Sequence, residues 1–261
     1  MDDVVFRREN QVEVITLNRP DMFNAISSNM LSMLSPKLED LAQDDDVRAV
    51  VLTGAGKGFC TGADLAGGGG RSDVNTPVGM RLSTHLYSRV IRGIVEMGKP
   101  VIGAINGVAA GAGCNLALAC DILIAAESAR FIEVFVRRGL VADAGGTYFL
   151  PRLIGLAKAK ELMFMGEAVD ASRALELGLV NKVVPDAGLM DEAMAMAKKL
   201  AKGPTSAIGM MKCMLNRSFE IDLGTALEFE AAMQGIAAST GDVIEGVTSF
   251  LEKRPPEFKG R

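Results

Sequence analysis

The sequence has no tryptophan, only two tyrosines and a single histidine, His85. Histidine is the side chain most often used for acid–base catalysis, so any such chemistry here has few candidates. His85 lies in T-H-L-Y-S-R, within a stretch predicted to be helical, and a helix-face role is favoured over a site role. Four cysteines are scattered without a C-x-x-C pair, which argues against zinc and fits free thiols in a reducing compartment. They are Cys60, Cys114, Cys120 and Cys213.

A dominant positive charge is also missing. The net charge is −4, which argues against nucleic-acid and membrane-surface partners. The one basic cluster, K-R-P-P-E-F-K-G-R at 253–261, is interpreted as a solvated tail. No apolar run reaches membrane-spanning length, and two aspartates follow Met1 directly, so we expect neither a signal peptide nor a membrane span. These features predict a cytoplasmic protein.

What the chain does contain is enough apolar material for a core, with 49% hydrophobic residues over 261 positions. Apolar strand candidates alternate with turns or helices, which predicts an α/β layered fold. We divide the chain into an α/β core at 1–200 and a helical C-terminal region at 201–261. Strands are predicted at 4–8, 12–17, 48–53, 101–105, 122–125 and 179–184, and helices at about 28–42, 77–97, 187–202, 204–219, 223–238 and 242–253. We expect 67–70 to be flexible and 131–151 to be irregular.

The stretch A-I-N-G-V-A-A-G-A-G-C-N-L-A-L-A-C-D at 104–121 is built almost entirely from small residues after a predicted strand. Small residues allow close approach of one backbone to another or to a ligand. A glycine-rich turn that opens a helix also leaves N–H groups free to bind an oxygen anion. On this stretch alone, an anion site and a tightly packed buried helix are equally supported.

A second glycine-bearing turn, F-C-T-G-A-D-L at 59–65, follows another predicted strand, as G-A-G-C-N at 111–115 follows the strand at 101–105. Neither turn matches a P-loop or a dinucleotide-binding fingerprint, because no G-K-[ST] follows and the third glycine is missing. Two backbone N–H groups that converge on one carbonyl oxygen are the better interpretation.

Seven motifs in order then carry a resemblance over nearly the whole chain. They are L-N-R-P-x-x-x-N-A (17–25), G-F-C-x-G-A-D-L (58–65), I-N-G-x-A-x-G-A-G (105–113), C-D-I-x-I-A-A (120–126), D-A-G-G-T (143–147), A-L-E-L-G-L-V-N-K-V-V (174–184) and E-G-V-T-S-F-L-E-K-R (245–254). Any one motif is weak, but the ordered set is specific. The chain resembles the enoyl-CoA hydratase/isomerase family, the crotonase superfamily.

The resemblance implies a crotonase-like spiral of ββα units with a C-terminal helical region for trimerisation and coenzyme A contact. It also implies homotrimers or hexamers and an acyl-CoA thioester substrate, with no metal or redox cofactor. The N–H groups of Ala63 and Ala112 would form the oxyanion hole, flanked by Gly111 and Gly113. Asp64 would be a turn or cap residue rather than an acid. Further substrate contacts are expected from Met22, Phe23, Leu65 and Ala66, and from the tail residues Phe250, Lys253, Phe258 and Lys259, in this chain or a neighbouring subunit.

The chain departs from the hydratase pattern at both catalytic glutamates that the resemblance would supply. Asn115 stands at the first position and Phe135 at the second, so hydration by paired carboxylates is not expected. Glu133 is near in sequence, but two residues along an extended segment displace a side chain by roughly 6–7 Å. We therefore interpret Glu133 as a surface residue.

A carboxylate occurs eight residues after Phe135, in L-V-A-D-A-G-G-T, as Asp143. Family isomerases are similar in placing an aspartate here, and a dehalogenase subgroup uses the matching residue as a nucleophile. The apolar neighbours Leu140, Val141 and Ala142 would desolvate the carboxylate and raise its pKa. The alternative is that Asp143 caps the helix near Gly145, and catalysis is favoured. Tyr148 is predicted either to line the acyl pocket or to pack in the core.

The sequence thus predicts an acyl-CoA double-bond isomerase in which Ala63 and Ala112 bind the thioester oxygen and Asp143 moves the proton. Three alternatives stay open. They are an enoyl-CoA hydratase, a dehalogenase or hydrolase with Asp143 as nucleophile, and a non-catalytic member that binds coenzyme A or RNA, of which the RNA binder is disfavoured by the acidic charge.

Overall fold

The computed structural model describes residues 2–64 and 76–261, arranged as two β-sheets with helices packed around them. The predicted residues Leu65 and Ala66 and the glycine run at 67–70 lie outside this described part. Within it, no helix combines the length and apolar composition that crossing a bilayer requires.

The larger sheet has six strands in the order β1-β2-β3-β5-β7-β10. Its first two strands form an antiparallel hairpin, and the remaining pairs are parallel. Its central strands are apolar at nearly every position because helices cover both faces, as expected for the predicted α/β layered fold. The strands are β1 (Val4–Glu9), β2 (Val12–Leu17), β3 (Ala49–Gly54), β5 (Val101–Ile105), β7 (Ile122–Ala126) and β10 (Lys182–Val184).

A smaller sheet of four short strands, in the order β4-β6-β8-β9, was not predicted. Its strands have three residues each, too few to show an alternating pattern. After β3, β5 and β7, the chain runs directly into β4, β6 and β8, so each repeat gives one strand to each sheet. The strands are β4 (Gly58–Cys60), β6 (Val108–Ala110), β8 (Arg130–Ile132) and β9 (Ala168–Asp170).

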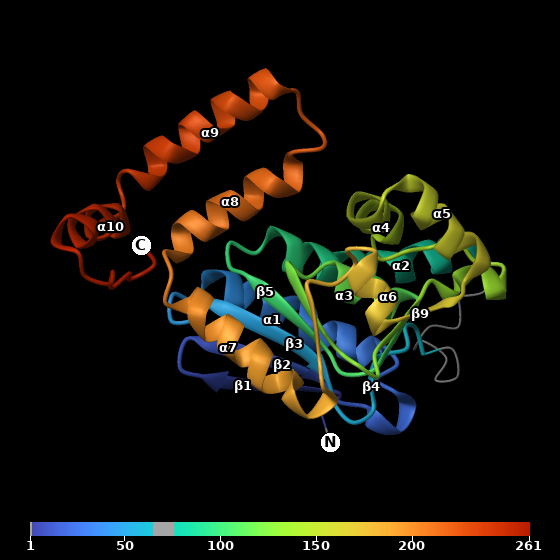
Figure 1. Ribbon diagram of the computed structural model, residues 1–261. Helices are drawn as coiled ribbons and strands as arrows, with labels where there is room; N and C mark the ends of the chain where they lie inside the picture. The colour runs from blue at the N-terminus through green and yellow to red at the C-terminus, as the bar shows by residue number, and fades with distance from the viewer. Residues whose placement is uncertain (1, 65–75) are drawn as a thin grey trace.

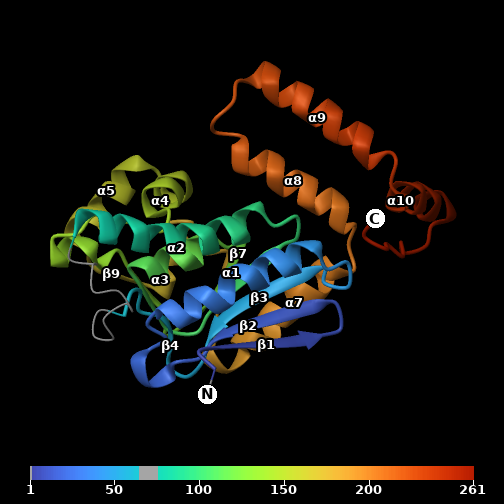
Figure 2. The same cartoon turned by 180° about the vertical axis from the view of Figure 1, so that it is seen from behind.

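Helices cover the large sheet on both sides. One side carries α1 (Ser28–Gln43), α2 (Pro77–Glu96) and α3 (Ala112–Leu118), whose apolar side chains join one core cluster. The other side carries α7 (Leu189–Ala201), which buries Ala193, Met194 and Ala197 in a second cluster and lies within the predicted helix at 187–202. Figures 1 and 2 show α7 and α1 on opposite faces of the sheet.

Residues 131–151, predicted to be irregular, are more regular than expected. They contain the end of β8, the 3-10 helix η3 (Val134–Arg138) and the start of α4 (Gly146–Ile154). The helices α5 (Leu156–Met165) and α6 (Ala171–Glu176) follow. Two further 3-10 helices are η1 (Pro20–Met22) and η4 (Asp186–Gly188).

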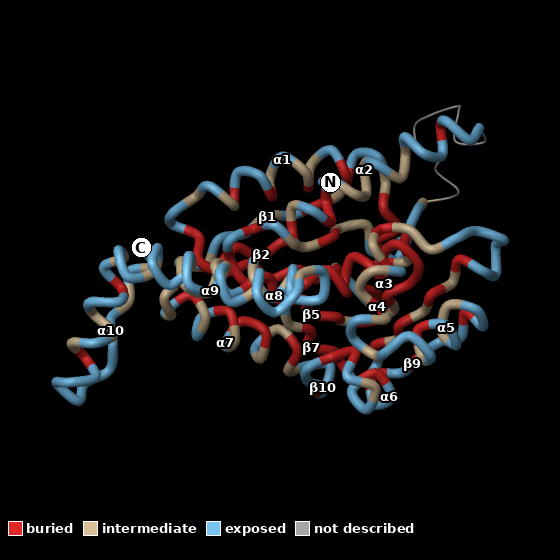
Figure 3. The backbone as a smooth tube through the Cα atoms, turned by 90° about the horizontal axis from the view of Figure 1, so that it is seen from above, coloured by how far each residue is buried: buried red, intermediate tan, exposed pale blue. Residues whose placement is uncertain are grey.

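Three further helices form an arm that projects from the core, α8 (Thr205–Arg217), α9 (Leu223–Ala237) and α10 (Gly241–Glu252). No residue of α9 is buried, and Figure 3 shows α8, α9 and α10 mostly in the colours of exposed and intermediate residues. Buried cations tie the arm to the core. Lys212 of α8 donates to the carbonyls of Ile94 and Lys99 and pairs with Asp121 at 2.7 Å. Arg48 donates to Thr205 Oγ1 and to the carbonyl of Phe258.

Candidate active site

The two glycine-bearing turns lie side by side because the strands before them are neighbours. β4 pairs with β6 in parallel, so the turns after Cys60 and Ala110 leave the same edge of the small sheet. Gly62 is essential to this approach, since a Cβ at that position would lie 2.7 Å from the carbonyl oxygen of Ala110. A Cβ on Gly113 would lie 2.3 Å from the carbonyl oxygen of Cys60. Glycine is therefore required on both sides of the contact.

Ala63 presents its N–H away from its neighbouring strand. In the parallel bridge with Ile26, the carbonyl of Gly62 accepts from the N–H of Ile26, and the N–H of Asp64 donates to the carbonyl of Ile26. The N–H of the residue between them then points to the opposite side. Among the described residues, nothing accepts a hydrogen bond from it.

Ala112 is the first residue of α3, and Gly111 precedes it with φ of 54°, a conformation that favours glycine. The first N–H groups of a helix have no partner within the helix. In the described part of the chain, nothing accepts from the N–H of Ala112 either. Two free donors thus border one cavity, whose lining includes both alanines.

The cavity has a volume of about 290 Å³ and is lined by the two turns, α2, η3 and the segment before α4. Phe135 lines it as a buried apolar side chain, and Gly111 contributes backbone. Asp64 also lines it, but its carboxylate pairs with Arg19 at 2.8 Å, which agrees with a structural role in the turn. Met22 and Phe23 lie beside the cavity, because Thr61, which lines it, donates its N–H to the carbonyl of Phe23.

Asp143 also lines this cavity, and no ion pair to its carboxylate occurs among the described residues. Its Oδ1 is buried and accepts no hydrogen bond from the described residues. Burial raises the pKa of Asp143 to about 6. The alternative of a helix cap is wrong, because α4 is capped by Gly145 and receives no side-chain hydrogen bond there. The predicted cause of desolvation needs correction, since Val141 is 87% exposed and Leu140 is also exposed.

Five predicted site residues do not line the cavity. Tyr148 does not line the cavity, because its hydroxyl donates to the carbonyl of Asn216 on α8 and its ring stacks on Arg152. Phe250 and Lys253 lie at the end of α10, with Phe250 exposed on the arm. Asn115 is buried behind the cavity, where its Nδ2 donates to the carbonyl of Asp143 at 2.8 Å. Gly113 packs against Cys60 rather than the cavity.

Glu133 is not a surface residue, so that interpretation is wrong. β8 ends at Ile132 and η3 begins at Val134, and the change of direction buries Glu133 behind the cavity. Sequence reasoning also missed Ser83, Thr84 and Tyr87 of α2, and Arg138, all of which line the cavity. A polar residue on an amphipathic helix can face either a pocket or the solvent, and the sequence pattern is the same in both cases.

Asn24 belongs to the motif at 17–25 and Asn106 to the motif at 105–113, and both have a structural role. Asn24 Nδ2 donates to the carbonyls of Ala55 and Gly58, and Asn106 Nδ2 donates to those of Gly56 and Gly58. Both amides thus fasten the loop that leads into the Ala63 turn. Within the described residues, no group of three possible metal ligands lies together. His85 is exposed and is not among the lining residues.

Comparison with known proteins identifies the family of this chain. The model of a family described as enoyl-CoA hydratase/isomerase matches residues 7–261, and the chain belongs to that family. It is 40% identical to the 1,2-epoxyphenylacetyl-CoA isomerase of Escherichia coli, over all of both chains. It is 39% identical to the short-chain-enoyl-CoA hydratase of Clostridium acetobutylicum, over 100% of this chain and 99% of that one.

Solved structures give the same result for the fold. The enoyl-CoA hydratase of Bacillus anthracis superposes with a TM-score of 0.93 at 36% identity, over 99% of this chain and 100% of that one. The chain therefore has the crotonase fold, a mixed α/β architecture, as the sequence predicted. The relatives carry both isomerase and hydratase names, so membership defines an enzyme of this family without choosing between the two reactions.

Proposed function

We propose that this protein is an acyl-CoA double-bond isomerase that uses Asp143 as its base. The observation that carries the proposal is the shared cavity, which is lined by both alanines with free N–H groups and by Asp143, whose Oδ1 has no hydrogen-bond partner among the described residues. The raised pKa of Asp143, about 6, suits a group that takes and returns a proton near neutral pH. The isomerase name of one 40% identical relative supports the same choice.

In the proposed reaction, the thioester oxygen of a 3-enoyl-CoA accepts hydrogen bonds from the N–H groups of Ala63 and Ala112. Asp143 takes a proton from C2, and the C–H electron pair forms a dienolate whose oxygen charge the two donors stabilise. The protonated Asp143 then gives the proton to C4. The double bond moves from C3–C4 to C2–C3, and Asp143 returns to its carboxylate form. No metal or redox cofactor takes part in the proposal.

The test is Asp143→Asn. It should lower isomerisation by about 10²–10⁴-fold, because it removes the base but keeps the side-chain shape. Binding of a saturated acyl-CoA, measured by calorimetry, should stay close to wild type. Asp64→Asn is the matched comparison, because it alters the other carboxylate in the cavity, which Arg19 already pairs, and it should lower activity far less than Asp143→Asn.

The substrates should be 3-enoyl-, 2-enoyl- and aryl-CoA thioesters, with products identified by NMR, because isomers have equal mass. Retained turnover in Asp143→Asn would contradict the base assignment. A covalent adduct on Asp143, detected by mass spectrometry, would favour the dehalogenase or hydrolase alternative.

A hydratase is the second candidate, and it is favoured by the hydratase names of other relatives. It would need a water held without glutamates at positions 115 and 135, where this chain has an amide and a phenyl ring. Hydration of crotonyl-CoA with kcat/KM of ~10⁴ M⁻¹s⁻¹ or more would establish this alternative.

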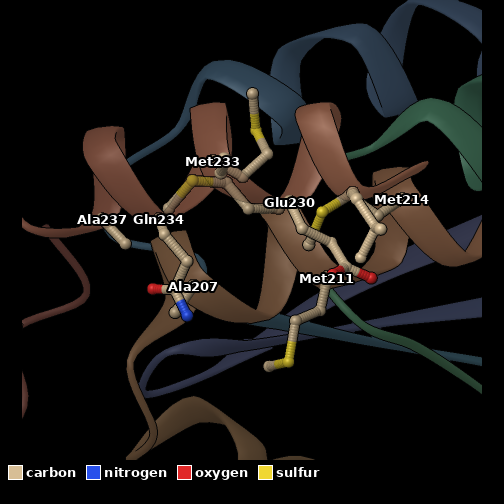
Figure 4. Close-up of a pocket in the computed structure, with 10 residues that line it drawn as sticks. Ala207, Met211, Met214, Glu230, Met233, Gln234 and Ala237 are labelled. Carbon is tan, nitrogen blue, oxygen red and sulfur yellow. The ribbon is translucent and has the colours of Figure 1, made fainter. Parts of the chain in front are cut away.

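We also propose that copies of the chain associate through the arm, as a trimer or hexamer. The arm exposes apolar side chains on all three helices, among them Leu215, Leu227 and Phe250. Between α8 and α9 lies a methionine-rich groove of about 460 Å³, with Met211, Met214 and Met233 around it (Figure 4). This groove shares no lining residue with the cavity between the two turns, and we propose that it packs against a second copy of the chain.

Leu227→Glu tests the association. The residue is exposed in the single chain, so the change should dissociate an oligomer without unfolding its subunits. Sedimentation velocity should show smaller species for Leu227→Glu and unchanged species for Glu228→Lys, a neighbouring charge change. A monomeric wild-type protein would refute the proposal.

A further inference from the structure

A second carboxylate, Glu133, lies behind the cavity and is used by no step above. It is only 4% exposed, although Val134 and Phe135, which follow it, line the cavity. In the described part of the chain, neither carboxylate oxygen has a hydrogen-bond partner of normal geometry. An ionised carboxylate without partners is very costly to bury, so this group requires an explanation.

The surroundings of Glu133 connect it to Asp143. The Cys114 thiol and the Asn115 amide, both on α3, lie close enough to Glu133 to influence its ionisation, and so does Asp143. Asn115 is completely buried and donates its Nδ2 to the carbonyl of Asp143. Its amide has little freedom to move, because Gly146 packs so closely that a Cβ there would lie 2.4 Å from Nδ2.

The unpartnered atoms of this group are all acceptors. They are Oε1 and Oε2 of Glu133, Oδ1 of Asn115 and Oδ1 of Asp143. A proton on Glu133 supplies the missing donor, because a carboxylic acid donates one hydrogen bond while a carboxylate only accepts. One of these unpartnered acceptors, Oδ1 of Asn115, belongs to a residue that lies close enough to Glu133 to influence its ionisation.

We propose that Glu133 is held as a neutral acid that donates to Oδ1 of Asn115, and that it thereby positions Asp143. This inference rests on the proposed function, because it assigns Glu133 a role toward the base. Glu133 is a positioning residue, since it acts through Asn115 and does not touch the cavity. The amide of Asn115 is then bound at both ends, by Glu133 at its oxygen and by the carbonyl of Asp143 at its nitrogen.

The backbone after Asp143 shows why the hydrogen bonds of the Asn115 amide matter for the position of the base. Ala144 has φ of 49° and Gly145 has φ of 84°, so the chain enters α4 through two left-handed residues. A left-handed alanine is unfavourable and persists only where surrounding contacts hold it. The hydrogen bond from Asn115 is one of these contacts, and it acts on the residue that carries the base. Loss of the hydrogen bond between Glu133 and Asn115 should misplace the Asp143 carboxylate rather than weaken substrate binding.

The network also predicts a dependence on pH. Burial raises the pKa of Glu133 to about 7, and the charge of Asp143 adds to this effect, while Cys114 and Asn115 oppose it. Arg137, on the same 3-10 helix, has its side chain beside Gly166. When Glu133 ionises, it loses its donor, and its charge competes with the carbonyl of Asp143 for the N–H groups of Asn115. Turnover should therefore fall as the pH rises above about 7.

Glu133→Gln and Glu133→Met separate this role from simple packing. Glutamine keeps a donor to Asn115 that does not titrate, so this variant should retain kcat and lose the alkaline decline. Methionine fills the space without a donor, and kcat should fall by about tenfold to 100-fold, as expected when a catalytic group is misplaced. KM should change by no more than about threefold, because binding groups are untouched. An alkaline decline that persists in Glu133→Gln, or full kcat in Glu133→Met, would overturn the inference.

Thermal unfolding gives a readout that is independent of activity. The folded protein holds the Glu133 proton up to pH about 7, whereas an ordinary glutamate loses it near 4.5. The folded state therefore binds more protons in this window, and wild type should lose stability relative to Glu133→Gln as the pH rises. The Tm difference between the two proteins should widen from about pH 5 to pH 8. A widening difference in a protein without isomerase activity would refute the proposed function alone, and a constant difference would refute the neutral acid.

Discussion

The two turns that supply the N–H donors are held in different ways. Ala112 begins a helix in which every residue is buried, so packing of the core fixes its position. Ala63 is exposed, and its turn is held by the bridge to Ile26 and by the ion pair between Arg19 and Asp64. One donor is therefore part of the rigid interior, and the other depends on a few polar contacts at the rim. The difference implies that mutations will affect the two halves of the site unequally.

Removal of the rigid donor should have the largest effect. Ala112→Pro deletes the N–H at the first helical position, where proline is otherwise well accepted. Loss of one oxyanion donor typically costs about 10²–10³-fold in kcat. Steady-state isomerisation assays on a 3-enoyl-CoA should show this loss.

Ala112→Ser is the matched control, because it changes the side chain and keeps the N–H. It should retain most of the activity, and circular dichroism should show both variants folded. Turnover near wild type in a folded Ala112→Pro would place the donor elsewhere, with the N–H of Gly113 as the next candidate.

Acidification should affect the base while both donors stay intact. The pKa of Asp143 is raised to about 6, and the base must be ionised to accept a proton, so kcat/KM should decline as the pH falls through this value. The decline should approach tenfold per pH unit below about pH 5. The measurement is cleanest in Glu133→Gln, where the alkaline decline should be absent.

His85→Ala should still show the decline of kcat/KM at acid pH, because His85 does not line the cavity. If the acid decline of kcat/KM disappears in that variant, the assignment of this decline to Asp143 is wrong.

Loosening the rim donor should have the smallest effect. Arg19→Met breaks the ion pair with Asp64 and the hydrogen bond to the carbonyl of Ala25, but leaves the N–H of Ala63 present. We expect kcat to fall by about threefold to tenfold, since an oxyanion donor is misplaced rather than lost. The decline of kcat/KM at acid pH should be unchanged. A loss as large as that of Ala112→Pro would show that both turns are equally sensitive, contrary to the comparison above.

The sequence predicted the large sheet, most helices and the two turns well, because each depends on local patterns. Buried parallel strands are continuous apolar runs, and the close approach of the turns requires glycine at fixed positions such as Gly62 and Gly113. The small sheet was missed because its strands are too short for periodicity to show.

The burial of Glu133 could not be predicted for a different reason. The estimate of its position assumed that the extended strand continued, but β8 ends at Ile132 and the 3-10 helix turns the side chain inward. The position of Tyr87 depends on how α2 packs against the turns, and that of Tyr148 on a carbonyl of α8, 68 residues away. Such long-range contacts leave no local trace in the sequence.

The parallel pairing of β4 with β6 has a consequence for how readily this site can change its chemistry. Neighbouring strands lie about 4.8 Å apart whatever their side chains, so the spacing of the two turns is inherited from main-chain hydrogen bonds. The rest of the cavity comes from separate elements, chiefly α2 and the segment around Asp143. Under the proposed function, Ser83, Thr84 and Tyr87 are therefore the residues to replace in order to admit a different acyl group, because the spacing of the two turns does not depend on them. In that proposal, the elements that bind the thioester are separate from those that select the acyl group.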